Sequence, residues 1–435
     1  MRGWFRPGAL VTLALLVCGV AGMPYPPAAG APAETPPNIV MIVSDDQGWP
    51  DFGFMGHPTI RTPHLDRLAA ESAVFPNGYV PTSLCRASLA TLLTGLYGHQ
   101  HRICCNDPPE GVDRTVMNTF LKQAPSLPRL LQQKGYASLQ TGKFWEGHYS
   151  NGGFTHGLTV KGRHGDDGLV IGRQTMEPIY DFIRGRQGKP FFVWYAPMMP
   201  HEPHNPPGQL LSKYTAPGRH PKVAAYWAMC EWFDETCGAL LKFLDDSKLR
   251  DNTIVLFVVD NGWIQETGGV RRTRGNFAPK SKLSPYDGGL RTPVMIRWPG
   301  RTRPGRYSDL VSTIDVAPTL LEAAGIQPPR PLPGLSLMRT SAGKGRLPRD
   351  SVFGELYVHT AVSLFRPSLN LTHRWMRKGD WKLILPVDRG EQPELYRVSV
   401  DPYEEKDLAE SETDRLAALQ VELEKWWDGG RRWNQ

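Results

Sequence analysis

The sequence predicts an α/β fold with a large central sheet, mixed but mostly parallel, flanked by helices. A smaller C-terminal α+β part with a short antiparallel sheet follows it. Three observations carry this prediction. Several segments are continuous apolar runs, which are typical of parallel strands buried on both faces. Helical patterns alternate with these runs. After a stretch rich in Pro, Gly and Arg, the pattern changes to short strands and one closing helix.

The strands of the first part are predicted from their apolar runs and the polar residues that end them. The run Asn38–Ser44 stops at two aspartates, and Thr253–Val259 stops at Asp-Asn-Gly. The run Pro190–Ala196 leads into a loop rich in proline and histidine. Polar groups therefore follow the carboxyl ends of strands, where open α/β sheets place their sites. The predicted strands are 38–44, 136–140, 190–196, 253–259 and 294–297.

The helices are predicted from apolar spacing together with residues that start or stop a helix. Thr62-Pro63 introduces the first helix, Gly135 follows the second, and Gly325 stops the last. The predicted helices of the first part are 64–72, 127–134, 223–246 and 314–324.

The C-terminal part begins after a linker at residues 328–349. Residues 375–385 and 394–398 are expected to form short antiparallel strands, and 414–427 a closing helix. These patterns predict a catalytic domain at 37–345 and a C-terminal α+β subdomain at 346–435.

The N-terminus has the pattern of a secretory signal peptide. Arg2 and Arg6 precede a short apolar run, and small residues and prolines follow it. We expect a signal peptide at 1–22 and a flexible Pro/Ala-rich segment at 23–36. The run is too short for a comfortable membrane span, and no other segment has transmembrane character. The predicted location is secreted or periplasmic; a lipid anchor at Cys18 is less favoured because Val17 fits the cleavage pattern poorly.

Composition limits the partners and the redox chemistry. The chain has 435 residues, ordinary globular composition and a net charge of +7, without a long basic run. This balance favours anionic small groups or polymers over nucleic acid. No cysteine spacing matches a zinc site. Cys230 and Cys237 are separated by about 10 Å of helix, too far to bond each other.

Two clusters of oxygen ligands follow neighbouring strands. Asp45 and Asp46 end the first strand, and Asp260 and Asn261 end the strand at 253–259. Alone, each cluster also fits a turn or a helix cap. Together they offer hard oxygen ligands at one sheet edge, which suits Ca²⁺ or Mg²⁺ rather than zinc.

Four further side chains are candidates for chemistry. Cys85 closes a Pro/Ser loop and opens a helical run, where free N–H groups favour a nucleophile or an anion; a buried structural cysteine is the alternative. Lys143 follows a predicted strand end and Lys282 precedes a glycine-rich turn; both would clamp a tetrahedral anion, unless they are simply solvated. His201, in a loop stiffened by prolines, is a candidate general acid.

With these residues in place, the chain resembles the formylglycine-dependent sulfatases of the alkaline-phosphatase-like superfamily. The resemblance covers about Pro37 to Trp427, and eight segments come in the family's order. These segments are 38–47, 62–69, 85–95, 135–143, 200–203, 260–262, 282–293 and 394–409.

The resemblance implies an alkaline-phosphatase-like sandwich and a role for each matching residue. Cys85 would be oxidised to formylglycine by a formylglycine-generating or sulfatase-maturing enzyme and would attack sulfur. Lys143 and Lys282 would stabilise the sulfate charge, and His201 would position the substrate or protonate the leaving oxygen. One Ca²⁺ would be held by Asp45, Asp46, Asp260 and Asn261.

Two positions depart from the family pattern, both close to Cys85. Leu89 stands where the signature has arginine, and Arg86 lies at a different helical angle. Trp145 stands where the first lysine motif has histidine; His148 follows nearby. The resemblance implies a sulfatase acting on a sulfated carbohydrate. The alternatives are a phosphoester or phosphonate hydrolase on the same fold and an inactive protein that binds sulfated glycans.

Overall fold

The computed structural model describes residue 1 and residues 36–263, 280–388 and 390–430. The predicted signal peptide at 1–22 and nearly all of the Pro/Ala-rich segment at 23–36 lie outside the described residues. Residues 36–435 form one compact unit. Within the described ranges, no helix combines the length and apolarity needed to cross a membrane.

The central sheet contains nine strands among the described residues, in the order β4-β3-β5-β1-β6-β7-β2-β8, with β9 beside β2. Only the pairings of β7 are antiparallel; every other pairing recorded in this sheet is parallel. The predicted mixed, mostly parallel sheet is thus confirmed. The strands are β1 (Asn38–Ser44), β2 (Ala73–Tyr79), β3 (Ala137–Gly142), β4 (His156–Gly157), β5 (Phe191–Ala196), β6 (Thr253–Val259), β7 (Arg291–Arg297), β8 (Gly305–Arg306) and β9 (Val311–Ser312).

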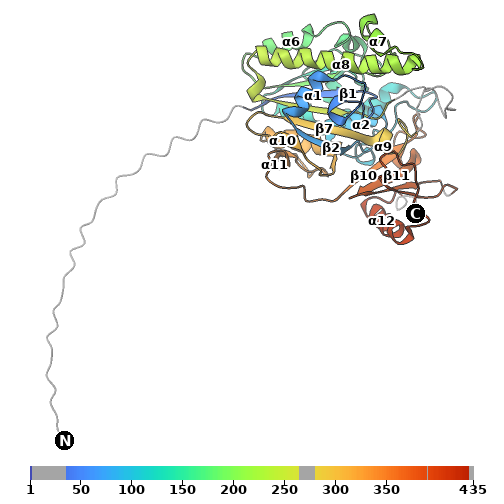
Figure 1. Cartoon of the computed structure of the whole chain (residues 1–435). Coiled ribbons are helices and arrows are strands. Elements are labelled where there is room, and N and C mark those ends of the chain that lie inside the picture. Colours follow the sequence, from blue (N-terminus) through green and yellow to red (C-terminus); the bar gives the residue numbers. More distant parts are fainter. Residues whose placement is uncertain (2–35, 264–279, 389, 431–435) are drawn as a thin grey trace. The chain divides into compact units, whose positions relative to one another are not determined.

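Helices cover both faces of this sheet, because successive strand residues point to opposite sides. Met41 of β1 packs in one apolar core with α2, α5 and α10, whereas Ile42 packs in another with α1, α6 and α8. Figure 1 shows α6 and α8 on one side of the sheet and α10 on the other. These helices are α1 (Pro63–Ala70), α2 (Cys85–Thr94), α5 (Leu127–Gln132), α6 (Glu177–Arg184), α8 (Pro221–Asp246) and α10 (Val316–Ala323). The shorter helices are α3 (Gly98–His101), α4 (Thr119–Gln123), α7 (Gly208–Tyr214), α9 (Asp287–Leu290) and α11 (Met338–Ser341).

The register of the central strands brings their carboxyl ends to one level. Ser44 of β1 pairs with Val259 of β6, and the Asp260 N–H donates to the Ser44 carbonyl at 2.9 Å. On the other side of β1, the Asp45 N–H donates to the Met199 carbonyl at 3.0 Å. The residues that follow β1, β5 and β6 are therefore next to one another.

A four-stranded antiparallel sheet forms the C-terminal part. It comprises β10 (Ser351–Tyr357), β11 (Leu371–Lys378), β12 (Trp381–Pro386) and β13 (Glu394–Arg397), in that order. Helix α12 (Thr413–Trp426) packs on one face through Leu419 and Leu423. On the other face Trp375 packs with Tyr79 of β2. Lys382 is fully buried at this junction, with Nζ 2.9 Å from Asp287 and 2.8 Å from Glu404.

The structure corrects one predicted strand and contains two seven-residue strands that were not predicted. Residues 375–385 form parts of two strands rather than one, because Gly379 (φ 53°) and Asp380 make a turn between β11 and β12. Strand β2 was not predicted, because Pro76 and Asn77 interrupt its apolar pattern. Strand β10, with Gly354 in its middle, was also missed. The other predicted elements agree with the structure to within a few residues. The domain boundary at 345/346 stays a prediction.

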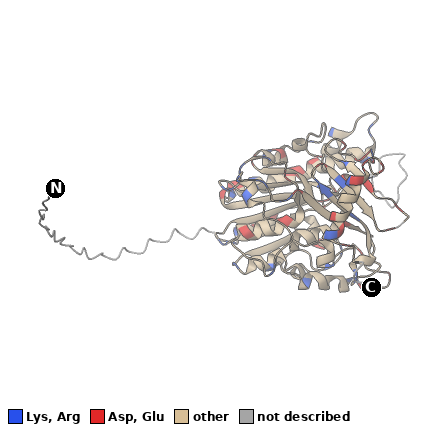
Figure 2. Cartoon of the chain, turned by 90° about the horizontal axis from the view of Figure 1, so that it is seen from below, with Lys and Arg blue, Asp and Glu red and all other residues tan. Residues whose placement is uncertain are grey.

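Charged residues are interspersed rather than separated. In the view of Figure 2, both Lys and Arg (blue) and Asp and Glu (red) are scattered over the ribbon. Local pairing, rather than the net charge, therefore decides the electrostatics of each site.

All five cysteines in the described part of the chain are buried free thiols.

Candidate active site

Four oxygen-bearing side chains meet where β1 and β6 end. Asp46 has a left-handed backbone (φ 56°), and its N–H donates to Asp260 Oδ1 at 3.2 Å. Asn261 Nδ2 donates to Asp46 Oδ1 at 2.6 Å. Asp45 lies beside them, and all four side chains are buried. The structure thus brings together the two clusters that the sequence places on separate strands.

Several oxygens of this group accept no hydrogen bond from the described residues. Asp45 Oδ2, Asp260 Oδ2 and Asn261 Oδ1 are buried without a hydrogen-bond partner among the described residues. Burial and the neighbouring Asp45 carboxylate raise the pKa of Asp260 well above its usual value. Buried oxygens without a hydrogen bond are costly, and a hard divalent cation is a partner that suits them. These residues therefore fit a divalent metal ion held by oxygen ligands.

Both predicted lysines are buried at the same place. Lys143 Nζ lies 2.6 Å from Asp45 Oδ1 and 3.6 Å from Asp260 Oδ2, and Lys282 Nζ lies 2.6 Å from Asp46 Oδ1. Burial opposes ionisation of Asp46, but the charges of Lys282, His201 and Lys143 hold its pKa well below the usual range. Burial opposes the charged form of both lysines, but the neighbouring carboxylates raise the pKa of each, so both ammonium groups are charged.

Gly142 allows Lys143 to approach the end of β5 closely. Its φ is +70°, and a Cβ at this position would lie 1.8 Å from the Ala196 carbonyl oxygen. Because only glycine tolerates both conditions, the dipeptide Gly-Lys fixes the lysine at the strand end.

Cys85 is the first residue of α2 and is buried against this cluster. Its Sγ lies 4.0 Å from Asp46 Oδ1. Burial raises the pKa of the thiol to about 11, although Lys143 and Lys282 act in the opposite direction. Unmodified Cys85 is therefore a neutral thiol at pH 7, and a neutral thiol is a poor nucleophile.

His201 closes the site from the loop after β5. Its Nδ1 donates to the Glu202 carbonyl at 2.6 Å, so Nε2 is the nitrogen that faces Asp46 Oδ2, at 3.3 Å. One potential ligand atom from each of Asp45, Asp46, Cys85 and His201 lies within 4.8 Å of the others. All eight site residues predicted from the sequence thus surround one point.

The surroundings of Cys85 differ from the pattern expected near its helix. Leu89 is buried in an apolar core. Arg86 does not point toward the site residues' carboxylates: it forms a bidentate ion pair with Glu146, at 2.6 and 2.8 Å, and donates to two backbone carbonyls. His148 accepts the Ser150 N–H in a local turn and is not part of the cluster.

Trp145 is buried beside Lys143 and is surrounded by cations. Arg163 lies 4.7 Å from the indole centroid, Arg114 5.2 Å and Lys143 Nζ 5.9 Å. Such contacts with a ring face are favourable, and more so when the cation is desolvated. Trp145 therefore helps to hold the guanidinium groups at one wall of the site.

His164 is a site residue that the sequence reasoning missed. Its ring lies 4.5 Å from Trp145, edge to face, and 6.0 Å from the ring of His201. Arg163 Nη1 is 3.1 Å from Nε2 and can only donate, so the proton of the neutral ring lies on Nδ1. Burial and the nearby cations lower the pKa of His164 to about 2. A lone histidine in a Gly/Asp loop carried no sequence signal for this position.

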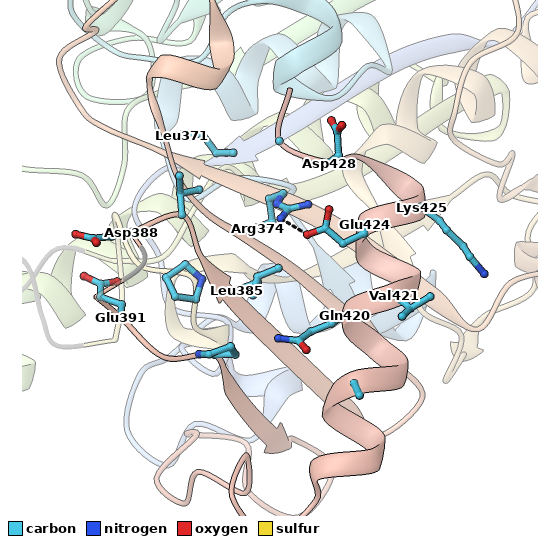
Figure 3. A pocket seen from close by; sticks show the side chains of 15 residues that line it. Leu371, Arg374, Leu385, Asp388, Glu391, Gln420, Val421, Glu424, Lys425 and Asp428 are labelled. Atoms are coloured by element: carbon cyan, nitrogen blue, oxygen red, sulfur yellow. Dashed lines mark hydrogen bonds and ion pairs between the residues drawn. The ribbon is translucent and has the colours of Figure 1, made fainter. Parts of the chain in front are cut away.

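A separate cavity of about 900 Å³ lies in the C-terminal part between β11, β12 and α12 (Figure 3). The ion pair between Arg374 and Glu424 lies in its wall. None of the predicted site residues lines this cavity.

Two family models match the chain. Residues 37–326 match the sulfatase model, and residues 277–428 match the model of the C-terminal part of N-sulphoglucosamine sulphohydrolase. The chain belongs to the sulfatase family. The human N-acetylgalactosamine-6-sulfatase is 32% identical, over 82% of this chain and 74% of the relative. Human arylsulfatase A is 30% identical, over 75% of this chain and 72% of the relative.

Several solved structures share the fold of this chain. One of them, a protein in complex with its substrate D-glucosamine-2-N,6-O-disulfate, superposes with a TM-score of 0.69 at 22% identity. The superposition covers 91% of this chain and 98% of that protein. The predicted family, its alkaline-phosphatase-like fold and its class, sulfuric ester hydrolase, are thus confirmed.

Proposed function

We propose that this sulfatase hydrolyses sulfate esters of a sulfated carbohydrate, with Cys85 converted to formylglycine and one Ca²⁺ held by Asp45, Asp46, Asp260 and Asn261. The observation that carries the proposal is the group of three buried oxygens that accept no hydrogen bond from the described residues, beside Cys85 and two ammonium groups. The names of the relatives, which include an N-acetylgalactosamine-6-sulfatase and an N-acetylglucosamine-6-O-sulfatase, support the carbohydrate substrate.

Each side chain has a defined task in this reaction. Lys143 and Lys282 bind sulfate oxygens and offset the charge that grows on them in the transition state. His201 in its doubly protonated form would donate the Nε2 proton to the leaving sugar oxygen, since Nδ1–H already donates to the Glu202 carbonyl. The calcium ion, when bound, supplies a positive charge that polarises the sulfate, and the hydrated aldehyde supplies the hydroxyl nucleophile. Secretion through the signal peptide at 1–22 and a maturing enzyme for Cys85 complete the proposal.

The first test follows the modification and the reaction together. Conversion of Cys85 to the aldehyde lowers the peptide mass by about 18 Da, since oxygen replaces sulfur and two hydrogens are lost. Protein from the native host should carry this change and release sulfate from sulfated sugars, and Cys85→Ala should abolish release. An unmodified thiol contradicts the formylglycine step. Faster turnover of phosphate esters supports a phosphohydrolase instead, and an aldehyde without turnover of any sulfated sugar supports a binding protein.

The metal assignment has a test that does not need turnover. Ca²⁺ at one hundred times its Kd should raise the free energy of unfolding of chelator-treated protein by about 2.7 kcal/mol. Asp260→Asn removes one charged ligand and should abolish most of this gain. Asp251→Asn, exposed at the opposite end of β6, is the matched control and should keep it. If Ca²⁺ raises the free energy of unfolding of both variants equally, the metal assignment is contradicted.

A further inference from the structure

The backbone and the ring of His164 are both held beside Lys143. The His164 carbonyl accepts the Phe144 N–H at 3.2 Å, and the carbonyl of the next residue accepts the Thr159 hydroxyl at 2.9 Å. The imidazole packs edge to face on Trp145, with 4.5 Å between the ring centroids. These contacts fix the imidazole at the wall of the candidate active site.

Two charged residues determine the orientation and the tautomer of this imidazole. Asp107 accepts from Arg163 Nε and Nη2, both at 2.7 Å, so a bidentate pair holds the guanidinium. The remaining nitrogen, Nη1, lies 3.1 Å from His164 Nε2. Because a guanidinium can only donate, Nε2 accepts and the ring proton lies on Nδ1. Burial and the nearby cations lower the pKa of His164 to about 2, so the ring is neutral at pH 7.

The Nδ1–H group of His164 is available to a ligand. Among the described residues none bonds to Nδ1, and this nitrogen is not fully enclosed. The ring lies 6.0 Å from the ring of His201, and the ammonium charges of Lys143 and Lys282 are close enough to lower its pKa. A sulfate bound by the two lysines therefore brings its oxygens near a neutral donor of fixed orientation. Such preoriented donors stabilise an oxyanion without a cost of reorganisation.

We propose that His164 is a further catalytic residue, which donates a hydrogen bond from Nδ1 to a non-bridging oxygen of the sulfate. Asp107 and Arg163 are positioning residues, because they hold the ring in the tautomer that donates. This role rests on the proposed function, since it adds one donor to the same sulfate. Trp145 occupies the position where the resemblance implies histidine, and the loop at 163–164 supplies the imidazole at this wall instead.

Two replacements of the histidine test the donor. His164→Leu should lower kcat/KM about tenfold to a hundredfold, because one hydrogen bond to a charged group is lost. The fall should be equal for 4-nitrophenyl sulfate and phenyl sulfate, since the bond is made to the sulfate and not to the leaving oxygen. His164→Asn places an amide N–H close to the position of Nδ1 and should keep most of the wild-type value. An equal fall in both variants, or a larger fall for the poorer leaving group, overturns the proposal.

Nitrogen NMR of histidine-labelled protein shows which ring nitrogen carries the proton, and a role in packing alone does not determine this. In the wild type the His164 signal, identified by its loss in His164→Asn, should show the proton on Nδ1. Arg163→Met removes the donor to Nε2, so both neutral tautomers should be populated, and kcat/KM should fall less than in His164→Leu. A proton on Nε2 in the wild type overturns the proposal. An unchanged tautomer in Arg163→Met contradicts the positioning role of Arg163.

A control and a binding measurement separate this role from the proposed function. His156→Leu replaces an exposed histidine of the edge strand β4 and should leave every value unchanged. If the wild type is active and His164→Leu is equally active, only the proposal for His164 fails. If the wild type releases no sulfate from any sulfated sugar, the proposed function fails.

Calorimetry with inorganic sulfate and Cys85→Ala decides the role of His164 even without turnover. Sulfate should bind about tenfold or more weakly when His164→Leu is added, because the same hydrogen bond is lost. Addition of His156→Leu should leave the affinity unchanged. Equal binding with and without His164→Leu overturns the proposal, as does the absence of any sulfate binding.

Discussion

Removal of the Glu146 carboxylate is expected to be one of the most damaging single changes near the site. Arg86 and Glu146 form a bidentate pair at 2.6 and 2.8 Å, and their side chains are only 2% and 4% exposed. The same guanidinium donates to the carbonyls of Cys105, at 3.2 Å, and Met117, at 2.9 Å. Arg86 follows Cys85, and Glu146 lies three residues after Lys143. The pair therefore joins the start of α2 to the segment that carries the first lysine.

The loss of stability depends on the Arg86 guanidinium, which stays buried when Glu146 is replaced. Glu146→Ala leaves a charged guanidinium in the interior with two carbonyl partners but no counter-charge. Breaking a buried pair in this way costs about 3–5 kcal/mol. Arg86→Met combined with Glu146→Leu removes both charges and leaves apolar side chains, so the double variant should be less destabilised than Glu146→Ala. It still loses the donors to the two carbonyls, at about 1 kcal/mol for each.

Urea unfolding followed by fluorescence measures these differences. Glu412→Ala, which breaks an exposed pair with Arg415, is the control and should change the free energy of unfolding by less than about 1 kcal/mol. If Glu146→Ala costs no more than this control, the buried pair is not what holds the two segments together. If the double variant is less stable than Glu146→Ala, the uncompensated charge is not the source of the cost.

Three further changes test other parts of the structure. His101 is buried and its pKa is lowered to about 3 by burial and by the charges of His99 and Arg86, so stability falls as pH drops below 6.5. The free energy of unfolding should fall between pH 7 and pH 5, and this fall should be about 2 kcal/mol smaller for His101→Gln than for the wild type. Lys382→Met removes the ammonium between two buried carboxylates, of which Asp287 keeps Arg291 at 3.9 Å, and should cost about 3–5 kcal/mol in urea unfolding; a cost near zero would contradict this. Gly142→Ala should prevent accumulation of soluble protein, because its Cβ meets the Ala196 oxygen. Gly135→Ala, at φ +79° with open space around it, should remain soluble and lose only about 1–2 kcal/mol.

The sequence was most informative where a strand ends in polar residues. The runs at 38–44 and 253–259 are buried on both faces, so apolar continuity alone located them. Their polar ends then located both ligand clusters. The pattern failed where tertiary contacts replace local preference: β2 contains Pro76, and its pairing with β7 shifts register between Phe75 and Gly78. No local pattern predicts such a strand, because its neighbours in the sheet hold it in place.

Site residues outside the recognisable segments could not be predicted for a related reason. His164 reaches the site because the carbonyl of its own residue accepts the Phe144 N–H at 3.2 Å, which brings its loop against the residue after Lys143. Arg163 is fixed by a bidentate pair with Asp107, which lies far away in sequence. The residues around position 164 do not predict either contact.

The two departures from the family pattern describe one rearranged wall of the site. Leu89 is an apolar side chain at the position where the sequence resemblance implies arginine, and Arg86 is paired with Glu146. At the same wall, Trp145 carries Arg163 on its ring, and Arg163 in turn orients the imidazole of His164. A cation and an imidazole are thus present near Lys143, but both come from the loop at 163–164. Under the proposed function, we therefore expect substitutions in that loop to change the rate of sulfate release more than replacement of Trp145 by histidine does.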